Sequence, residues 1–213
     1  MIRDFIRWLY GKRQIVYFNG DQSKNKVALT FDDGPNPPRT DKVLDILDMY
    51  NAKATFFILG KHAVLFPETV MEIQKRGHLI GGHSYSHSRE NDDIEKGLET
   101  VETITGEKII FIRAPYNDWK SFPSLKSMKG KKIVGSTFHS YDWRLKGVEA
   151  TVGYYTKNIA KCSVITMHDG DHKVDRGSRP DQMIEALPQI LEKTKGFKYV
   201  RLDEMELVLK EVE

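Results

Sequence analysis

An apolar segment that runs directly into two acidic residues constrains the fold of this chain most strongly. Residues 27–31 read Val-Ala-Leu-Thr-Phe and are followed by Asp32, Asp33, Gly34 and Pro35. A short apolar run that ends in a turn is typical of a buried strand in a parallel sheet. Folds of the α/β class place their chemistry at the carboxyl ends of such strands. We therefore expect the two carboxylates at the mouth of an α/β sheet, although an ordinary Asp-containing turn is the alternative for this motif taken alone.

The remainder of the chain alternates apolar segments with helical patterns, which predicts an α/β barrel or a related layered fold. Thr40 is expected to cap a helix that continues to Tyr50, and helical periodicity recurs at residues 93–105 and 181–195. The candidate strands are residues 27–31, 54–59, 79–81, 109–113, 132–136, 163–168 and 198–201. A functional site is expected where the ends of these strands meet.

Two histidines, His83 and His87, follow the third candidate strand. At this spacing on a helical turn the two imidazoles would point the same way, and with one carboxylate they would offer three ligands to Zn²⁺ or a similar divalent ion. Such pairs also arise by chance on protein surfaces. The order of this pair between Asp-Asp-Gly-Pro and two later motifs, Arg-Ala-Pro-Tyr at 113–116 and Met-His-Asp-Gly at 167–170, strengthens the metal interpretation. We assign no role to the three histidines without such spacing, His62, His78 and His172.

With these motifs the chain resembles the NodB-homology polysaccharide deacetylases, carbohydrate esterase family 4, from about Lys26 to Leu207. The resemblance implies a distorted (β/α) barrel with about seven parallel strands. It also implies a hydrolase that removes N-acetyl groups from an amino-sugar polymer, oligomer or lipid-linked glycan, using one divalent metal ion, with Zn favoured and Co, Fe or Ni as alternatives. The implied metal ligands are Asp33, His83 and His87, the catalytic residues are Asp32 as base, His168 as acid, Arg113 and Asp142, and the substrate-binding residues are Tyr116, Trp143 and Thr166.

The chemistry of amide hydrolysis is compatible with these residues. A bound metal acidifies water and polarises a carbonyl group, and Asp32 would accept the proton of the water. His168 would protonate the amine leaving group, because an imidazole titrates near neutral pH. Arg113 would keep Asp32 ionised and correctly oriented.

Two residues depart from the family pattern and leave alternatives open. His139 stands where an Asp usually precedes the pair Asp142 and Trp143, so the tuning of the acid histidine is an open question. Thr166 replaces the Leu that usually lines the acetyl pocket, which leaves the acyl group open. An O-deacetylase, a deformylase or a small-amide hydrolase with the same site is one alternative, and a weakly catalytic carbohydrate-binding homologue is another.

Length and charge indicate one enzyme domain. The 213 residues can bury a single core, and a net charge of +3 without a basic stripe argues against a nucleic-acid partner. We expect an N-terminal amphipathic helix and lead-in at residues 1–25, the deacetylase domain at 26–207 and a tail at 208–213. The single cysteine, Cys162, cannot form an intrachain disulfide.

Residues 2–13 are basic and amphipathic, and they are expected to pack on the barrel, with weak contact to a membrane surface as the alternative. The sequence contains no run approaching the ~20 apolar residues of a membrane span and no signal-peptide pattern. A cytoplasmic location is therefore expected, with the cell envelope or secretion as the alternative if a signal has been removed. The sequence leaves the oligomeric state open, and a glycan is the expected partner.

Overall fold

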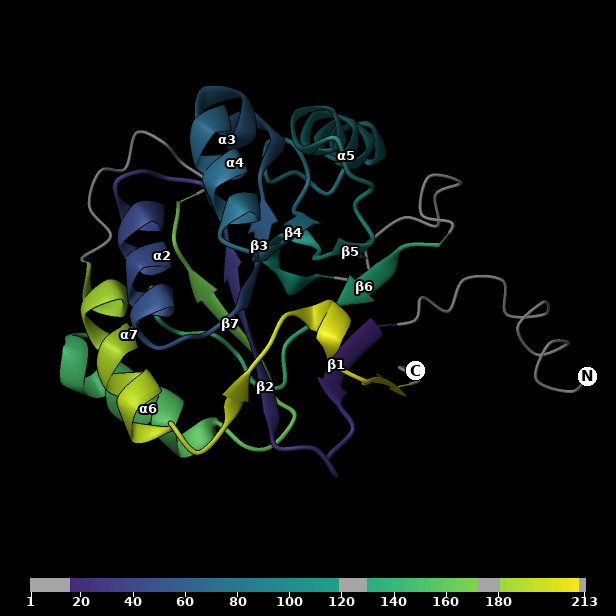
Figure 1. The fold of residues 1–213 in the computed structure, drawn as a ribbon. Helices are drawn as coiled ribbons and strands as arrows, with labels where there is room; N and C mark the ends of the chain where they lie inside the picture. The colour runs from purple at the N-terminus through teal and green to yellow at the C-terminus, as the bar shows by residue number, and fades with distance from the viewer. Residues whose placement is uncertain (1–15, 119–129, 172–180, 211–213) are drawn as a thin grey trace, which may run out of the picture.

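The computed structural model describes residues 16–118, 130–171 and 181–210. Within these ranges the strands form one curled sheet, and helices pack against it along the left and the top of the view in Figure 1. The amphipathic segment expected at residues 2–13 lies outside the described residues. In the part of the chain that the structure describes, each helix is too short or too polar to cross a membrane.

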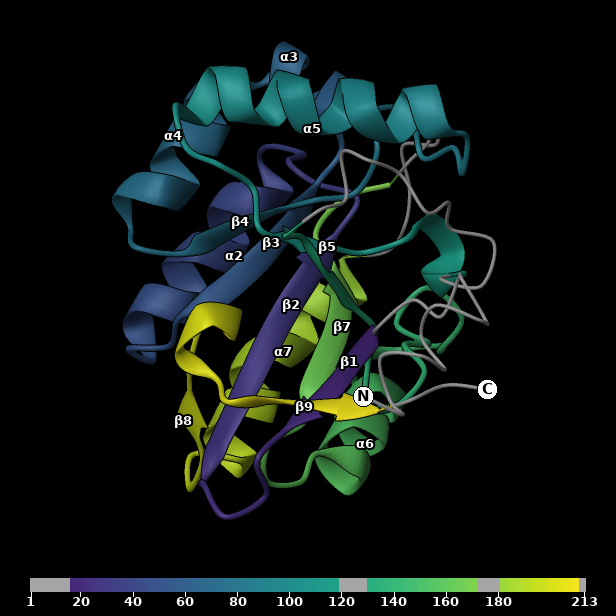
Figure 2. The same ribbon diagram turned by 90° about the vertical axis from the view of Figure 1, so that its right-hand side faces the viewer.

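The sheet follows the order β7-β2-β3-β4-β5-β6-β1-β9, and β8 pairs with the start of β2. The strands are β1 (Val16–Gly20), β2 (Lys26–Asp32), β3 (Ala54–Ile58), β4 (Leu79–Gly82), β5 (Phe111–Ile112), β6 (Lys132–Val134), β7 (Val164–His168), β8 (Lys198–Tyr199) and β9 (Leu207–Lys210). Neighbouring strands are parallel except β9, which runs antiparallel to β1. The sheet curls so that β1 approaches β7, and an antiparallel bridge joins Asn19 to Ser163 there (Figure 2).

The expected distorted (β/α) barrel is confirmed, and each of the seven expected strands occurs, although β5 is only two residues long. Two further strands, β1 and β9, lie in segments that the sequence assigned to the lead-in and, for most of β9, to the tail. Within each strand the apolar run is only three residues long, at residues 16–18 and 207–209, so neither run stands out from the polar and charged residues around it.

The expected helical patterns correspond to α2 (Arg39–Met49), α5 (Asn91–Thr105) and α7 (Gln182–Lys193). Three further helices were not expected: α3 (Gly60–Leu65), α4 (Pro67–Lys75) and α6 (Val148–Asn158). The expectation that Thr40 caps α2 is wrong. Pro38 occupies the cap position, and Thr40 lies inside the first turn, where its hydroxyl accepts the N–H of Asn36 at 2.8 Å and donates to Asp169 at 2.6 Å.

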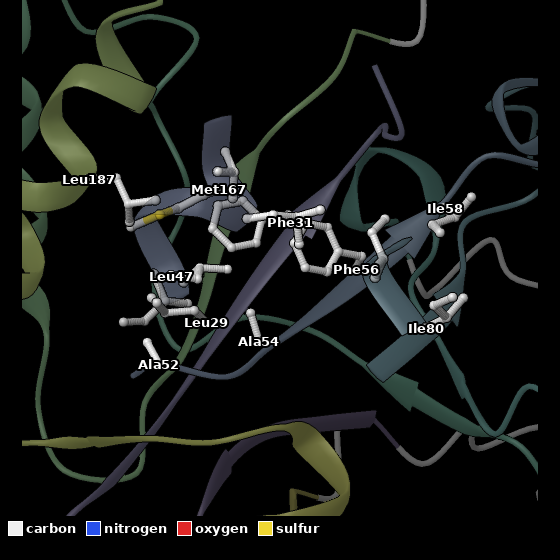
Figure 3. Close-up of a cluster of buried hydrophobic side chains, with 14 of the residues drawn as sticks. Leu29, Phe31, Leu47, Ala52, Ala54, Phe56, Ile58, Ile80, Met167 and Leu187 are labelled. Carbon is white, nitrogen blue, oxygen red and sulfur yellow. The ribbon is translucent and has the colours of Figure 1, made fainter. Parts of the chain in front are cut away.

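The core has two layers because successive residues of a strand point to opposite faces of the sheet. Leu29 and Phe31 of β2 face the helices, where Leu47 of α2 and Leu187 of α7 belong to the same apolar cluster (Figure 3). The residues that alternate with them face the barrel interior. The interior cluster is Ala28, Phe57, Phe111, Val134, Cys162, Val164, Val200, Leu202 and Met205. The polar residues of β2 follow Ala28 on this inner face, so they lie toward the mouth of the barrel.

Candidate active site

Two adjacent parallel strands place an acid and an imidazole side by side at the mouth of the barrel. The register between β2 and β7 pairs Asp32 with His168, and it pairs Thr30 with Thr166 two residues earlier. Because residues two apart on a strand share a face, all four side chains are directed to the barrel interior. The two residues predicted as base and acid are therefore neighbours in the sheet, and the two threonines form a layer beneath them.

The three predicted metal ligands converge beside this pair. The Nε2 atoms of His83 and His87 lie 3.5 and 3.4 Å from Oδ1 of Asp33, and one ligand atom from each residue fits within 4.8 Å of the others. All three side chains are buried. His83 Nδ1 lies 2.9 Å from the carbonyl oxygen of Arg113, which fixes the tautomer in which Nδ1–H donates and Nε2 presents its lone pair to the cluster.

This donor set fits a divalent metal ion. Two imidazole nitrogens and one carboxylate oxygen are the ligands of zinc and of related ions in open, catalytic sites. The electrostatics agree with the donor set. Burial acts to lower the pKa of His83, but the negative charges of Asp32 and Asp33 raise it more, so that the pKa lies above its ordinary value. The pocket thus favours a positive charge at this point.

The expectation that His83 and His87 share a helical turn is wrong. Residues 83–88 form a loop after β4 that belongs to neither a helix nor a strand. Ser84 and His87 have positive φ angles of 68° and 70°, and this backbone, rather than helical spacing, brings the two imidazoles together. The N–H of His87 donates to the Ser84 hydroxyl at 3.0 Å, which closes the turn.

Asp33 also has a positive φ angle, 69°, and its backbone is held by the loop that follows β7. A Cβ on Gly170 would lie 2.3 Å from the Asp33 carbonyl oxygen, and a Cβ on Gly34 would lie 2.4 Å from the carboxylate of Asp169. The two loops can approach this closely because both positions are glycine. Burial raises the pKa of Asp169 to about 7, even though the Thr40 hydroxyl donates to its carboxylate.

Arg113 crosses the barrel interior to the predicted base. Its Nη1 donates to Oδ1 of Asp32 at 2.7 Å and to the hydroxyl of Thr30, while Nε and Nη2 donate to the carbonyl oxygens of Val134 and Gly135. The guanidinium is 1% exposed. A buried cation with this many acceptors holds the Asp32 carboxylate in one position, as the sequence analysis expects.

Asp142 is the partner of His168. Its Oδ1 lies 2.8 Å from His168 Nδ1, and its Oδ2 accepts the backbone N–H of His168 at 2.7 Å. Burial acts to lower the pKa of His168, but the charge of Asp142 and the hydrogen bond to it raise the pKa to about 9. The Ser140 hydroxyl donates to the same carboxylate at 2.7 Å. The imidazole is thus held as a cation with its Nε2 edge free of the Asp142 contact.

The structure places His139 and Thr166, the two departures from the family pattern that leave alternatives open. His139 is exposed, and the carboxylate that bonds to His168 is that of Asp142, three residues later. The residue at position 139 is therefore not needed for this ion pair. Thr166 is 7% exposed and lies in the threonine layer beneath His168, where its carbonyl oxygen accepts the hydroxyl of Tyr155 at 2.9 Å.

The predicted aromatic residues lie at the rim. Tyr116 is 60% exposed, and its ring packs against His87 at 4.4 Å between centroids, with the Arg89 guanidinium 4.8 Å from the ring. Trp143 is 52% exposed and borders a hollow of about 600 Å³ that extends to Gln182 at the start of α7. Both rings can contact a bound sugar. The Tyr116 ring thus lies beside the metal cluster, in the short 3-10 helix Pro115–Asn117, and Trp143 adjoins the His168 pair through its backbone N–H, which donates to Asp142 Oδ1.

Two side chains without a sequence-predicted role hold the site in place. The His62 Nδ1 lies 2.8 Å from the carbonyl oxygen of Asp33, so a histidine to which we assigned no role supports a predicted metal ligand. Gln182 Nε2 donates to the carbonyl oxygens of Asp142 and Leu145, both at 2.6 Å. Neither contact has a sequence signal, because each side chain bonds to a backbone carbonyl of a segment distant in the chain.

Comparisons with known proteins agree with this geometry. The family model described as polysaccharide deacetylase matches residues 19–129. Over 197 residues the chain is 36% identical to a peptidoglycan-N-acetylglucosamine deacetylase of Bacillus cereus, which covers 88% of this chain and 70% of that protein. Over 159 residues it is 30% identical to a chitooligosaccharide deacetylase of Azorhizobium caulinodans, covering 70% of this chain and 76% of that protein.

A solved structure extends the likeness to three dimensions. The crystal structure of a peptidoglycan N-acetylglucosamine deacetylase in complex with 4-naphthalen-1-yl-N-oxidanyl-benzamide superposes with a TM-score of 0.80 at 32% sequence identity. The superposition covers 93% of this chain and 95% of that chain. The similarity therefore extends over nearly all of both chains.

Proposed function

The chain belongs to the polysaccharide deacetylase family, carbohydrate esterase family 4, and on this premise we propose that it removes N-acetyl groups from N-acetylglucosamine residues of peptidoglycan. The observation that carries the proposal is the convergence of Asp33, His83 and His87 beside the paired Asp32 and His168. The chain is also similar along nearly its whole length to proteins named peptidoglycan-N-acetylglucosamine deacetylase. Chitooligosaccharide is the second candidate, because relatives with that substrate in their names also match.

We assign one divalent ion, zinc, to Asp33, His83 and His87. Each ligand is a type that zinc accepts, although Co, Fe and Ni suit the same donors. When bound, such an ion supplies a Lewis acid that acidifies water and polarises the amide carbonyl. The protein holds the ligands in place from outside: the backbone of Arg113 orients His83, and His62 and Gly170 fix the backbone of Asp33.

Asp32 serves as the base in this proposal. Its Oδ1 is held by the Arg113 guanidinium, which leaves Oδ2 to accept the proton of the attacking water. Arg113 can stay charged because three further acceptors, Thr30, Val134 and Gly135, satisfy its other N–H groups. The Asp32 carboxylate therefore does not have to reorient during the reaction, which lowers the reorganisation that the step requires.

His168 serves as the acid. Its Nδ1–H is directed at Asp142, so the proton on Nε2 is the one delivered to the amine nitrogen as the C–N bond breaks. The ion pair with Asp142 raises the pKa of the imidazole, to about 9 in the metal-free protein, and so favours its protonated form at neutral pH. On the rim, we assign the substrate's oxyanion to the backbone N–H of Tyr116, and one sugar face to the Trp143 ring.

The proposed substrate favours one cellular location, and Thr166 supports a second candidate for the acyl group. A peptidoglycan substrate favours the cell envelope over the cytoplasm, and a weak membrane contact through residues 2–13 would be compatible with that location. Thr166 supports one alternative, because its polar side chain lies in the layer beneath His168. An O-acetyl or N-formyl substrate is the corresponding second candidate for the acyl group.

Acetate release tests the proposal. The purified protein is stripped of metal, reconstituted with Zn²⁺ or Co²⁺, and incubated with peptidoglycan, N-acetylglucosamine oligomers of increasing length, or p-nitrophenyl acetate. Metal-dependent release from peptidoglycan above that from the oligomers is the expected result. Release from the ester alone would point to a different acyl substrate, and glycan binding without any release would favour a carbohydrate-binding homologue.

A further inference from the structure

We propose that Asp93, in the first turn of α5, is a positioning residue that holds the loop between the two histidine ligands and thereby sets the metal affinity of the site. This inference rests on the metal centre of the proposed function. Asp93 lies outside the sequence motifs that supply the predicted ligands and catalytic residues, and its role follows from its contacts with Tyr85, Ser86 and Ser88.

One carboxylate accepts three backbone N–H groups of the loop. Oδ2 of Asp93 accepts the backbone N–H of Tyr85 at 3.0 Å, of Ser86 at 2.9 Å and of Ser88 at 3.3 Å. Oδ1 accepts the hydroxyl of Ser86 at 2.7 Å. The N–H of Tyr85 also reaches the backbone carbonyl of Asp93 at 2.9 Å. The loop is thus folded around a single anion supplied by a neighbouring helix.

The loop needs such an anchor because it has no regular hydrogen-bond ladder of its own. It belongs to neither a helix nor a strand, and it contains positive φ angles at Ser84 and at His87. Non-glycine residues keep this conformation only where surrounding contacts enforce it. Charge-assisted bonds from backbone N–H groups to a carboxylate are among the stronger contacts available for this purpose.

A second contact on the same helix face supports the arrangement. Gly97 lies four residues after Asp93, one turn further along α5, so the two residues face the same side. A Cβ on Gly97 would lie 2.3 Å from the carbonyl carbon of Ser84. The helix backbone is therefore in direct contact with the loop at one point, and the Asp93 carboxylate bonds to it at another, so α5 determines the position of the loop.

The link to metal binding is geometric. His83 ends the strand side of the loop and His87 lies within it, so the separation of their Nε2 atoms depends on the path of residues 84–86. A loop that is free to sample other paths presents the two imidazoles in the binding geometry for only part of the time, and its apparent metal affinity falls by that fraction. Outer partners of metal ligands typically change affinity by about 10–100-fold when they are removed.

The test compares Asp93→Ala with Asp92→Ala in the full-length protein. Asp92 is exposed, stands in the same first turn and carries the same charge, so it controls for net charge and for the helix dipole. Affinity for Zn²⁺ and for Co²⁺ is measured by competition with a chromophoric chelator, and the absorption spectrum of bound Co²⁺ reports the coordination geometry. We expect Asp93→Ala to weaken binding at least about tenfold and to alter the Co²⁺ spectrum, with Asp92→Ala unchanged.

Asp93→Asn guards against misfolding, because it keeps the shape of the side chain and one acceptor oxygen, and an intermediate metal affinity is expected. Gly97→Ala is an independent test, because it displaces the same loop by a steric clash and should also weaken metal binding. Wild-type affinity and spectrum in both Asp93 variants would overturn the inference. If the wild-type protein itself binds neither ion, the metal centre of the proposed function fails instead, so the two failures are distinguishable.

Discussion

Replacing Asp142 by Asn is expected to move the alkaline limit of activity to lower pH. In the wild-type protein the charge of Asp142 and its hydrogen bond raise the pKa of His168 to about 9 from 6.5, against the opposing effect of burial. Asn is the same size and can still accept a hydrogen bond, but it carries no charge. Burial is then opposed only by the weaker effects of the Asp33 and Asp32 charges, and the pKa of His168 falls toward its ordinary value.

The magnitude follows from these values. At pH 7.5 a group with a pKa of about 9 is roughly 97% protonated, whereas one at 6.5 is roughly 9% protonated. If His168 must donate a proton, kcat at pH 7.5 should fall by up to about tenfold and recover on acidification. A bound divalent ion lowers the pKa of His168 in both proteins, so the quantity to compare is the displacement between the two pH profiles.

Stability supplies a second measurement on the metal-free protein. The pKa of His168 is higher in the folded protein than in the unfolded chain, so its contribution to stability is complete below pH 6.5 and is lost as the pH rises to about 9. At ~1.4 kcal/mol per pH unit, the free energy of unfolding should fall by about 3 kcal/mol across this window. Urea unfolding should show that loss in the wild type and a smaller loss in Asp142→Asn.

A matched control uses the same carboxylate. Ser140→Ala removes the hydroxyl that donates to Asp142 Oδ1 but leaves the charge in place, so its pH profile should stay close to that of the wild type. If the Asn variant retains the wild-type alkaline limit, or if both variants shift equally, His168 is not tuned by the charge of Asp142.

Three further predictions concern the base, the metal and the loop behind it. Asp32→Asn should reduce kcat by about 10²–10⁴ while Zn²⁺ affinity, measured by calorimetry, is retained; a variant with near-normal turnover would exclude Asp32 as base. Chelation should lower the unfolding free energy by about 2.7 kcal/mol relative to protein in metal at 100 times its Kd, and a melting temperature indifferent to metal would argue against this site. Gly170→Ala places a Cβ 2.3 Å from the carbonyl oxygen of Asp33, so it should weaken metal binding and destabilise the fold by about 1–3 kcal/mol. Gly153→Ala, which meets no atom within 4 Å in helix α6, should by contrast be neutral or slightly stabilising in the same melting assay.

The contrast between the two glycines shows what a sequence pattern can and cannot report. Gly153 stands between Val152 and two tyrosines, and Gly170 stands between two aspartates. In the structure Gly153 faces open space, whereas Gly170 touches a metal-ligand backbone. The distinction depends on which loops meet at the barrel mouth. That meeting is a property of the folded chain: the Met-His-Asp-Gly motif marks Gly170 as part of the site, but it does not report the contact with the Asp33 backbone.

The same limit explains the corrected predictions. The spacing of His83 and His87 suggested a helical turn, because four residues is the helical neighbour distance. The structure reaches the same meeting of imidazoles through a loop with positive φ angles, held by Asp93 from the next helix. Likewise the sequence predicts that Thr40 caps the N-terminus of α2. In the structure its hydroxyl donates to Asp169, which is distant in sequence.

The sequence by itself determined the fold class, the positions of the longer strands and the identity of the polar residues at their ends. These features are local, because the hydrophobic period and the turn residues depend on residues that are close together in the sequence. Only the tertiary structure decided how those residues act together. It paired Asp32 with His168 through strand register, and it gave Asp142 rather than position 139 to His168. Such contacts join segments far apart in the chain, so they form, and stabilise the site, only when the chain is folded.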